Sequence, residues 1–189
     1  MARRVGVTRE QLISVAGQLA DANGLEHLTL AQVAERLGIR IPSVYNHVDG
    51  LPGLRRELSI LGGRQIMEKI NRAAIGKSAD EAVMAVAQAF RRYAMEHHGL
   101  YAASVRAPAA DDLEAQQFGR EIVDVVLAVL EPYQLGETDA IHAVRGLRSI
   151  IHGFVMLEQA GGFGMPIDRE ESFLFLIETF LVGLHARGK

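Results

Sequence analysis

Apolar positions in the first part of the chain recur three or four residues apart, the spacing of one face of an α-helix. The first such segment follows Thr8 and stops at Asn23-Gly24, and the second follows Thr29 and stops at Gly38. Each threonine precedes a glutamine by three residues, which is a capping-box arrangement at a helix start. Each glycine suits the left-handed position just past a helix end. The pattern therefore predicts two short helices between these signals.

A third, shorter segment begins at Ile41-Pro42, because proline is favoured in a first helical turn, and it stops at the Asp-Gly pair that follows. Beyond it the pattern predicts longer helices, one of which opens with Ser78 and Glu81 as a third capping box. These longer helices are expected at about residues 51–75, 78–94, 111–131, 138–160 and 168–187. No strand-like alternation and no internal repeat interrupts them, so the expected fold class is all-α.

Composition narrows the class of protein without assigning a function. The chain has 189 residues, of which 49% are apolar and 23% charged, and such a chain can bury a core of its own. It has no cysteine, which excludes disulfides, thiolate metal sites and a cysteine nucleophile. The sequence shows neither a signal peptide nor a run of about 18 apolar residues, so we expect a cytoplasmic protein without a membrane span.

Charge divides the chain into two unlike parts. Residues 1–77 carry 11 Lys or Arg against 7 Asp or Glu, whereas residues 78–189 carry 9 against 16. A basic first part on an acidic body suggests that one end of the molecule meets a polyanion and the other does not.

The segment Leu28–Val48 contains a motif that explains why the first part of the chain is basic. A short helix, a tight glycine turn and a second short helix are the parts of a helix-turn-helix. Val44 and Val48 lie four residues apart and are expected to face the core. The rest of the second helix is then available for DNA: Ile41, Pro42, Ser43, Tyr45, Asn46 and His47. A hairpin of core helices shares the spacing but would favour Leu, Ala, Glu and Lys there, so the polar run favours DNA binding.

Within this segment an Ala-x-x-Leu-Gly turn spans Ala34 to Gly38, and a Tyr-x-His-Val run spans residues 45–48. With Thr29 before them, these features resemble the DNA-binding region of the TetR/AcrR family of one-component repressors, over about residues 8–58. The resemblance implies an all-helical, Ω-shaped homodimer with a three-helix head and a larger helical-bundle body. It also implies three parts: a helix-turn-helix DNA-binding domain (1–50), a connecting helix (51–77), and an effector-binding and dimerisation domain (78–189).

The resemblance implies that this chain is a ligand-responsive transcriptional regulator that binds double-stranded DNA. Repression is the family's commonest mode, with release from a palindromic operator when a small molecule binds the body. No cofactor is implied.

Carried over by position, the DNA contacts fall into two groups. Base readout is expected from Arg40, Ile41, Ser43 and Asn46, with Pro42 beside them, and backbone contacts from Thr29, Tyr45 and His47. The family's phosphate-binding lysine near the start of the fourth helix is replaced here by Leu51. Either Arg55 or Arg56 takes over that contact, or binding relies more on the N-terminal arm with Arg3 and Arg4.

The body has a family-like feature as well. Residues Arg145–Phe163 are similar to a C-terminal subgroup marked by a Trp-x-x-x-His-Gly signature, of which His152-Gly153 is retained. Arg148 occupies the tryptophan position.

An effector pocket in a helical bundle lies between helices and is mostly apolar. The expected lining is Phe90, Tyr93, Tyr101, Phe118, Ile122, Arg148, His152 and Met156. Of these, Arg148, His152 and Met156 are successive fourth residues and are expected to share one stripe of a helix. An arginine and a histidine there would favour a ligand with an acidic or carbonyl end. The alternative is that these residues are ordinary core.

The last helix is apolar over a broad face, and we expect part of it to form the subunit interface. That face consists of Phe173, Leu176, Ile177, Phe180, Leu181 and Leu184. The alternative is a fully buried C-terminal helix. The connecting helix contains Gly62-Gly63, each glycine costing about 1 kcal/mol relative to alanine, and we expect a pivot there that spreads the heads.

Two other classes of function compete with this interpretation. A histidine-dependent enzyme would need metal-pair spacing, a nucleophile motif or a phosphate-binding loop, none of which the sequence contains. A helical interaction module would leave the exposed run Ser43–His47 unexplained. We therefore expect no catalytic residue and no metal site.

Overall fold

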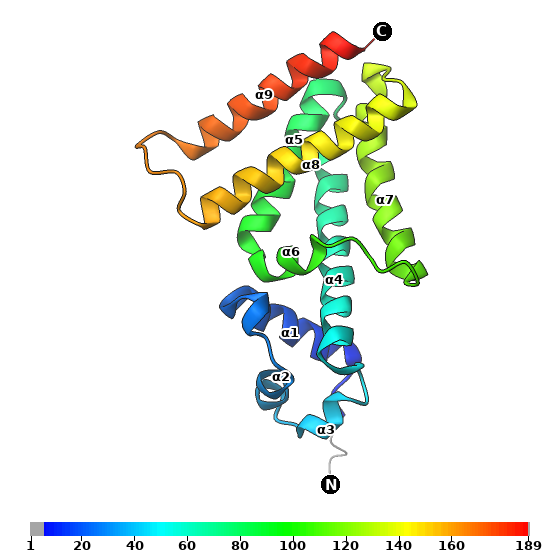
Figure 1. Ribbon diagram of the computed structural model, residues 1–189, viewed down its shortest axis with the longest axis vertical. Coiled ribbons are helices and arrows are strands. Elements are labelled where there is room, and N and C mark those ends of the chain that lie inside the picture. The colour runs from blue at the N-terminus through cyan, green and yellow to red at the C-terminus, as the bar shows by residue number, and fades with distance from the viewer. Residues whose placement is uncertain (1–5, 189) are drawn as a thin grey trace.

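The computed structural model describes residues 6–188, and regular structure in that range is helical, with no strand (Figure 1). Arg3 and Arg4 lie outside the described residues. In chain order the elements are α1 (Arg9–Asn23), η1 (Leu25–His27), α2 (Leu30–Leu37), α3 (Ile41–Val44), α4 (Gly50–Ala74), α5 (Ala79–Glu96), α6 (His98–Ser104), α7 (Leu113–Leu130), η2 (Glu131–Tyr133), α8 (Glu137–Gln159) and α9 (Arg169–Arg187). The longer helices expected from the pattern are confirmed to within two residues, but α6 was not expected.

The capping residues explain where the first helices begin. Thr8 Oγ1 accepts a hydrogen bond from the Gln11 backbone N–H at 3.2 Å, and Gln11 Oε1 accepts one from the Thr8 N–H at 3.0 Å. Thr29 and Gln32 repeat this reciprocal pair at the start of α2. Both capping boxes are confirmed, and each satisfies backbone donors that a helix start leaves free.

The third expected capping box is wrong. Ser78 does occupy the N-cap position of α5, but its side chain makes no capping hydrogen bond. Glu81 instead forms an ion pair with Lys77, with 3.6 Å between Oε1 and Nζ. The serine-to-glutamate spacing fits a capping box, but Ala79, at the first helical position, has a positive φ of 45°, which departs from the backbone geometry of a regular helix start.

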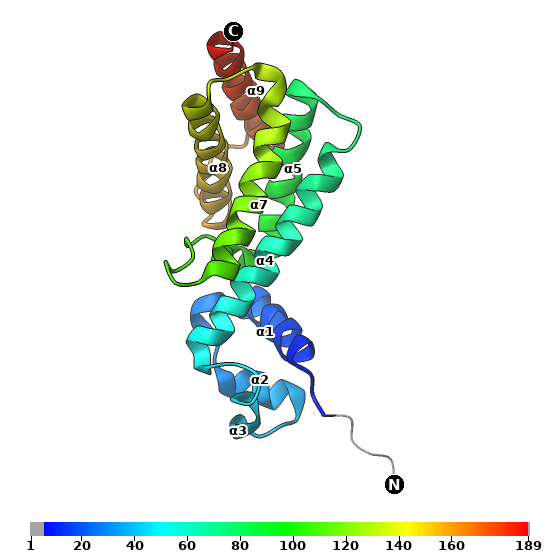
Figure 2. The same cartoon turned by 90° about the vertical axis from the view of Figure 1, so that its right-hand side faces the viewer.

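Two hydrophobic cores follow one another along the molecule. In the head, α1, α2 and α3 pack against the first half of α4, which contributes Leu54 and Leu58. In the body, the second half of α4 contributes Ile66 and Ile70 to a core shared with α5, α7, α8 and α9. Figure 2 shows α4 running from the head into the body, so this one helix belongs to both cores.

Gly62-Gly63 lies at the middle of α4 without interrupting it. A Cβ atom on Gly62 would lie 2.6 Å from the Leu100 carbonyl oxygen of α6, and one on Gly63 would lie 2.7 Å from Phe118 Cε1 of α7. The pair is therefore needed for the close approach of α6 and α7 to α4. The pivot expected at this pair stays a prediction, because the packing alone explains the two glycines.

Candidate nucleic-acid interface and ligand cavity

The turn between α2 and α3 directs α3 outward. Gly38 adopts a left-handed conformation (φ 65°, ψ 30°) just past the end of α2. Its N–H donates to the Glu35 carbonyl at 3.1 Å, and the Ile39 N–H donates to the Ala34 carbonyl at 3.0 Å. This paired arrangement is a Schellman motif, which ends a helix and reverses the chain sharply. A residue with a Cβ would be strained at this φ, so glycine fixes the angle at which α3 leaves the head.

Two valines fix the orientation of α3 against the head. Val44 and Val48 are buried, as expected, and α3 itself ends at Val44 before the turns formed by residues 45–47. The opposite side faces solvent, where Tyr45 is 59% exposed and Ile41 44% exposed. The other outward residues are Arg40, Pro42 and Asn46, with Ser43 and His47 half-buried beside them. Hydroxyl, amide, imidazole and guanidinium groups are thus presented together on one convex end of the molecule, which suits a groove of DNA.

Of the remaining residues expected to contact DNA, some are exposed in the head and one points toward the body. Thr29 is exposed at the start of α2, and its hydroxyl already bonds with Gln32. Arg55 is exposed on α4 and donates to the Leu25 carbonyl at 3.4 Å. Arg56 points the other way, because its guanidinium pairs with Asp112 and Glu114 of the body. Of the two arginines expected to replace the missing lysine, only Arg55 is therefore placed to do so.

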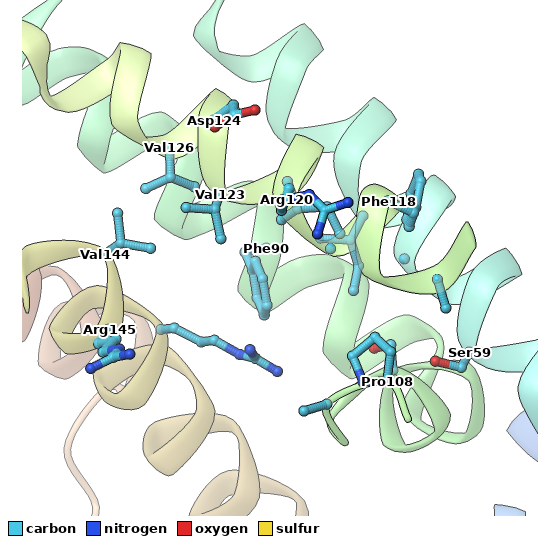
Figure 3. A pocket seen from close by; sticks show the side chains of 18 of the residues that line it. Ser59, Phe90, Pro108, Phe118, Arg120, Val123, Asp124, Val126, Val144 and Arg145 are labelled. Carbon is cyan, nitrogen blue, oxygen red and sulfur yellow. The ribbon is translucent and has the colours of Figure 1, made fainter. Parts of the chain in front are cut away.

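A cavity of about 680 Å³ lies in the body between α4, α5, α6, α7 and α8 (Figure 3). Five of the eight expected lining residues surround it: Phe90, Tyr101, Phe118, Ile122 and Arg148. Three more arginines, which the sequence analysis missed, also line it: Arg106, Arg120 and Arg145. Arg145 lies one helical turn before Arg148, so the sequence could have placed these two together. Arg106 and Arg120 come from other parts of the chain, and they reach the cavity only through the packing of α7, and of the segment after α6, near α8.

Three expected lining residues lie elsewhere. Tyr93 is buried in the body core, where its hydroxyl donates to Gln65 Oε1 at 3.0 Å. Met156 is 47% exposed on the outer surface of α8. His152 does not line the cavity, although its Nδ1 lies 2.7 Å from the Tyr101 hydroxyl, which does. The single-stripe expectation is wrong because four residues overshoot one helical turn by about 40°, so the eight residues from Arg148 to Met156 rotate about 80°.

Tyr101 is the polar contact between α6 and α8 at this cavity. Burial raises the pKa of its phenol to about 12, so the hydroxyl keeps its proton at neutral pH. A neutral hydroxyl can bond with the imidazole of His152 without a charge being buried. The contact between Tyr101 and His152 therefore joins α6 to α8 beside the cavity.

The expected dimer face is mostly wrong. Phe173, Ile177, Leu181 and Leu184 are buried within the protomer's own core, and Leu176 and Phe180 are half-buried against it. The apolar residues of α9 that do face solvent are Phe175 at 71% exposure and Val182 at 69%. Because α9 is apolar on two sides, its periodicity did not reveal which side turns inward.

Two apolar residues of α8 are exposed as well. Met156 and Leu157 face solvent on α8, and α8 and α9 lie on the opposite side of the body from α4 (Figure 2). We call Met156, Leu157, Phe175 and Val182 the α8–α9 surface. An exposed apolar area built from two neighbouring helices is typical of a helix-bundle interface.

Head and body meet at the start of α6. Asp21 of α1 accepts a hydrogen bond from the Leu100 N–H at 2.9 Å, and its other oxygen lies 2.8 Å from His97 Nδ1. Leu100 itself is buried in the head core. The next residue, Tyr101, lines the cavity. Two consecutive residues of α6 thus touch the core of the head and the cavity of the body.

The chain has relatives that match it along nearly its whole length. It is 33% identical over 190 residues to the HTH-type transcriptional regulator YobS of Bacillus subtilis, covering 100% of this chain and 98% of that protein. It is 36% identical over 188 residues to the HTH-type transcriptional regulator Rv0681 of Mycobacterium tuberculosis, covering 99% and 86%. Residues 83–180 match the family described as tetracyclin repressor-like, C-terminal domain. The chain belongs to the TetR family.

Solved structures agree with the fold of this TetR-family chain. A TetR variant from Acinetobacter baumannii AYE, in complex with minocycline, superposes with a TM-score of 0.75 at 19% identity, covering 97% of this chain and 100% of that one. The helical head followed by a bundle is thereby the TetR fold. The subgroup resemblance at Arg145–Phe163 lies inside the matched residues 83–180 and stays a prediction.

Two properties of the described residues bear on other functions. Within residues 6–188, no helix combines the length and apolar character needed to cross a membrane. No cluster of three or more His, Asp or Glu side chains suited to a metal ion occurs in the same range.

Proposed function

We propose that this TetR-family chain is a ligand-responsive DNA-binding regulator that represses transcription by occupying a palindromic operator. The observation that carries the proposal is the outward face of α3. Val44 and Val48 hold the helix by one side, and Tyr45 and Ile41 remain largely in solvent on the other. This outward side carries hydroxyl, amide and guanidinium groups together with an aromatic ring, the chemistry that contacts phosphates and base edges. The curated relatives, both named as HTH-type transcriptional regulators, support DNA as that partner.

Individual contacts follow from side-chain chemistry. We assign base readout to Arg40, Ser43 and Asn46, because their donors and acceptors match base edges, and Ile41 and Pro42 to thymine methyls. Tyr45, His47 and Thr29 are assigned to the sugar-phosphate backbone, as is Arg55 on α4. Backbone contacts set the register of the head, and base contacts select the sequence.

The operator-binding unit is proposed to be a two-fold dimer. The α8–α9 surface supplies the apolar area, and a second copy of the same surface covers it under two-fold symmetry. Two recognition helices in such a dimer read half-sites about one DNA turn apart, roughly 34–36 Å, and a palindromic operator follows.

Release from DNA is proposed to run through α6. A molecule in the cavity meets Tyr101, whose neighbour Leu100 is fixed in the head core. The N-terminus of α6 is held to α1 by Asp21, so displacement of α6 moves the head directly. The operator is released when the two heads no longer match the half-site spacing. A cytoplasmic location and the absence of a catalytic role belong to the same proposal.

Selection of bound sequences from random duplex DNA tests the proposal. The wild type is expected to enrich a palindrome, and Tyr45→Ala and Ser43→Ala are expected to lose it. Gln18→Ala, an exposed position on α1 away from α3, is the matched control and should enrich the same sequence. A folded dimer that enriches nothing at low salt would overturn DNA binding and favour a protein-interaction module.

A further inference from the structure

Four arginines surround the opening of the body cavity. They come from separate parts of the chain: Arg106 from the segment after α6, Arg120 from α7, and Arg145 and Arg148 from α8. Figure 3 shows Arg120 and Arg145 on facing helices with the apolar lining between them. All four side chains are exposed, so they form a rim rather than part of the core.

None of these four arginines has a carboxylate partner within the described residues 6–188. Arg148 donates instead to the Val105 carbonyl, at 2.9 Å. Two other arginines of the body do have such a partner: Arg91 contacts Glu158 and Glu170, and Arg187 lies 3.8 Å from Asp139. Asp124 is the acidic residue that lines the cavity beside the four arginines. The rim therefore carries a net positive charge, although residues 78–189 as a whole have 9 basic and 16 acidic residues.

Gathering four of nine basic residues around one opening is electrostatically unfavourable in the empty protein. Like charges that face one another repel, and abundant carboxylates elsewhere could have paired with them. An anion at the rim would remove this repulsion. Guanidinium groups bind carboxylate and phosphate oxygens through paired, charge-assisted hydrogen bonds, which makes them the side chain suited to such a ligand.

The interior of the cavity is suited to an apolar part of a ligand. Behind the rim the walls are apolar, with Phe90 of α5, Ile122 of α7 and Ile151 of α8 among the lining residues. The volume of about 680 Å³ holds roughly 20 non-hydrogen atoms, taking about 30 Å³ for each. A ligand held in this space must therefore be mostly apolar, and an acyl chain of about 12 to 18 carbons fits inside it.

We propose that the effector is an anionic amphiphile, with an apolar chain inside the cavity and a carboxylate or phosphate group at the arginine rim. The inference rests on the proposed function, since it names the class of ligand that the regulator senses. A free fatty acid and an acyl thioester of coenzyme A offer this chemistry from two sources. In the first the carboxylate meets the rim, and in the second the phosphates do so outside the opening.

Titration calorimetry with four C12 probes tests the ligand class: dodecanoate, dodecanoyl-coenzyme A, dodecanol and dodecyltrimethylammonium, each below the concentration at which it forms micelles. We expect at least one anionic probe to bind roughly tenfold or more tighter than the alcohol and the cation. The tighter of the two anionic probes identifies the source. Equal or tighter binding of the alcohol or the cation, or no binding of either anionic probe, would overturn the proposal.

Paired variants assign the selectivity to the rim. Arg120→Met/Arg145→Met removes two rim charges. Their side chains form no hydrogen bond or ion pair within residues 6–188, so we expect the variant to fold. Arg92→Met/Arg169→Met removes two exposed charges of the same body away from the cavity and is the matched control. The rim variant should weaken anionic probes about tenfold and leave dodecanol unchanged, whereas the control should change neither. Equal loss in both variants, or no loss in the rim variant, would overturn the assignment.

Operator binding measured without any ligand separates this inference from the proposed function. If the protein enriches a palindrome but does not bind the anionic probes, the proposed ligand class is overturned and the proposed regulatory function stands. A protein that binds dodecanoate at the rim but no DNA would keep the ligand class and lose the regulatory role.

Discussion

At the scale of single residues, neighbouring positions in the recognition segment have separate duties. Val44 is buried and Tyr45 is 59% exposed, although they are adjacent in the chain. The valine contributes to folding through packing, and the tyrosine contributes little to it, since its ring lies mostly in water. A comparison of the two therefore separates DNA contact from stability.

We expect Tyr45→Ala to weaken operator binding by roughly tenfold to a hundredfold, because a hydrogen bond to a charged phosphate contributes about 1.5–3 kcal/mol. Its free energy of unfolding should change by less than about 0.5 kcal/mol, as at other exposed positions. Val44→Ala should instead lose about 2 kcal/mol of stability by removing two buried methyl groups. Fluorescence anisotropy and urea unfolding measure the two effects, and a Tyr45→Ala protein with native affinity would contradict the assignment.

Asp112 pairs with Arg56 of α4, and the contribution of this ion pair to stability depends on pH. Hydrogen bonds from the Arg56 guanidinium, and then from the Ala115 backbone N–H, hold the pKa of its carboxyl below the usual value. The Arg56 Nη2 atom lies 2.7 Å from Asp112 Oδ1. A lowered pKa in the folded state stabilises the protein above the unfolded value of about 3.9, and that stabilisation is lost as pH falls through the folded value.

We therefore expect Asp112→Asn to lower the melting temperature at pH 7 and to match the wild type once the pH falls well below 4. Asparagine keeps the N-cap of α7, so the change isolates the ion pair. Asp111→Asn, at an exposed carboxylate next to it, should leave the melting temperature unchanged at both pH values. A constant difference across the pH range would show that the aspartate acts through packing.

At the scale of elements, α6 is the segment that joins two functions. It is short, it begins directly after the His97 cap of α5, and its third and fourth residues belong to different cores. Asp21 fixes its first turn to the head by accepting from Leu100 N–H and approaching His97. In the proposed release from DNA, the strength of this attachment sets how much of a ligand-driven shift reaches α3.

We expect Asp21→Ala to reduce the ratio of operator affinities measured without and with ligand, while operator affinity without ligand stays within about threefold of the wild type. Glu68→Ala, which removes an exposed ion pair on α4, is the control and should keep the ratio. The measurement is operator binding titrated at zero and saturating ligand, with dodecanoate as the first probe. An unchanged ratio would place the coupling elsewhere, such as in Gly62-Gly63.

Sequence periodicity predicted some elements well for local reasons. Hydrogen bonds between residues three to five apart form the capping boxes at Thr8 and Thr29 and the turn at Gly38. The local sequence therefore contains all the information needed to predict them. The inward and outward sides of α3 followed from the same spacing. The outward surface of α3 was therefore predictable in outline before any tertiary contact was known.

The rest depended on contacts between distant segments. α6 has only seven residues and no side-chain cap, so no local signal marks it. The buried side of α9 is decided by α5 and α8, because both of its sides are apolar. Arg106 and Arg120 reach the arginines of α8 only through the packing of α7, and of the segment after α6, around the cavity. These features require the whole fold, and periodicity within one helix does not contain them.

At the scale of the whole molecule, the two ends of the protomer have different tasks, and the α8–α9 surface is proposed to fix the distance between two heads. Phe175 and Val182 are its most exposed members. Burial of such side chains in a helix-bundle interface stabilises a dimer by excluding water from them. A carboxylate placed there would lose its hydration without a partner.

We expect Phe175→Glu/Val182→Glu to sediment as a monomer at concentrations where the wild type is a dimer. Operator affinity should fall by more than about tenfold, because each head then binds its half-site alone. Ile75→Glu, an equally exposed apolar position at the end of α4, should remain a dimer. A dimeric double variant would mean that another face joins the subunits.

The seam between head and body has a consequence for hybrid regulators. A Cβ on Gly99 would lie 2.2 Å from the backbone of Ala20, so α6 and α1 touch main chain to main chain. A head exchanged between relatives at the end of α4 would leave half of this junction behind. The residues around Gly99 follow the cut in sequence, and a side chain larger than hydrogen at Gly99 would clash with the α1 backbone. A recombinant protein made from this chain should therefore carry α6 across together with its head, as a discontinuous module.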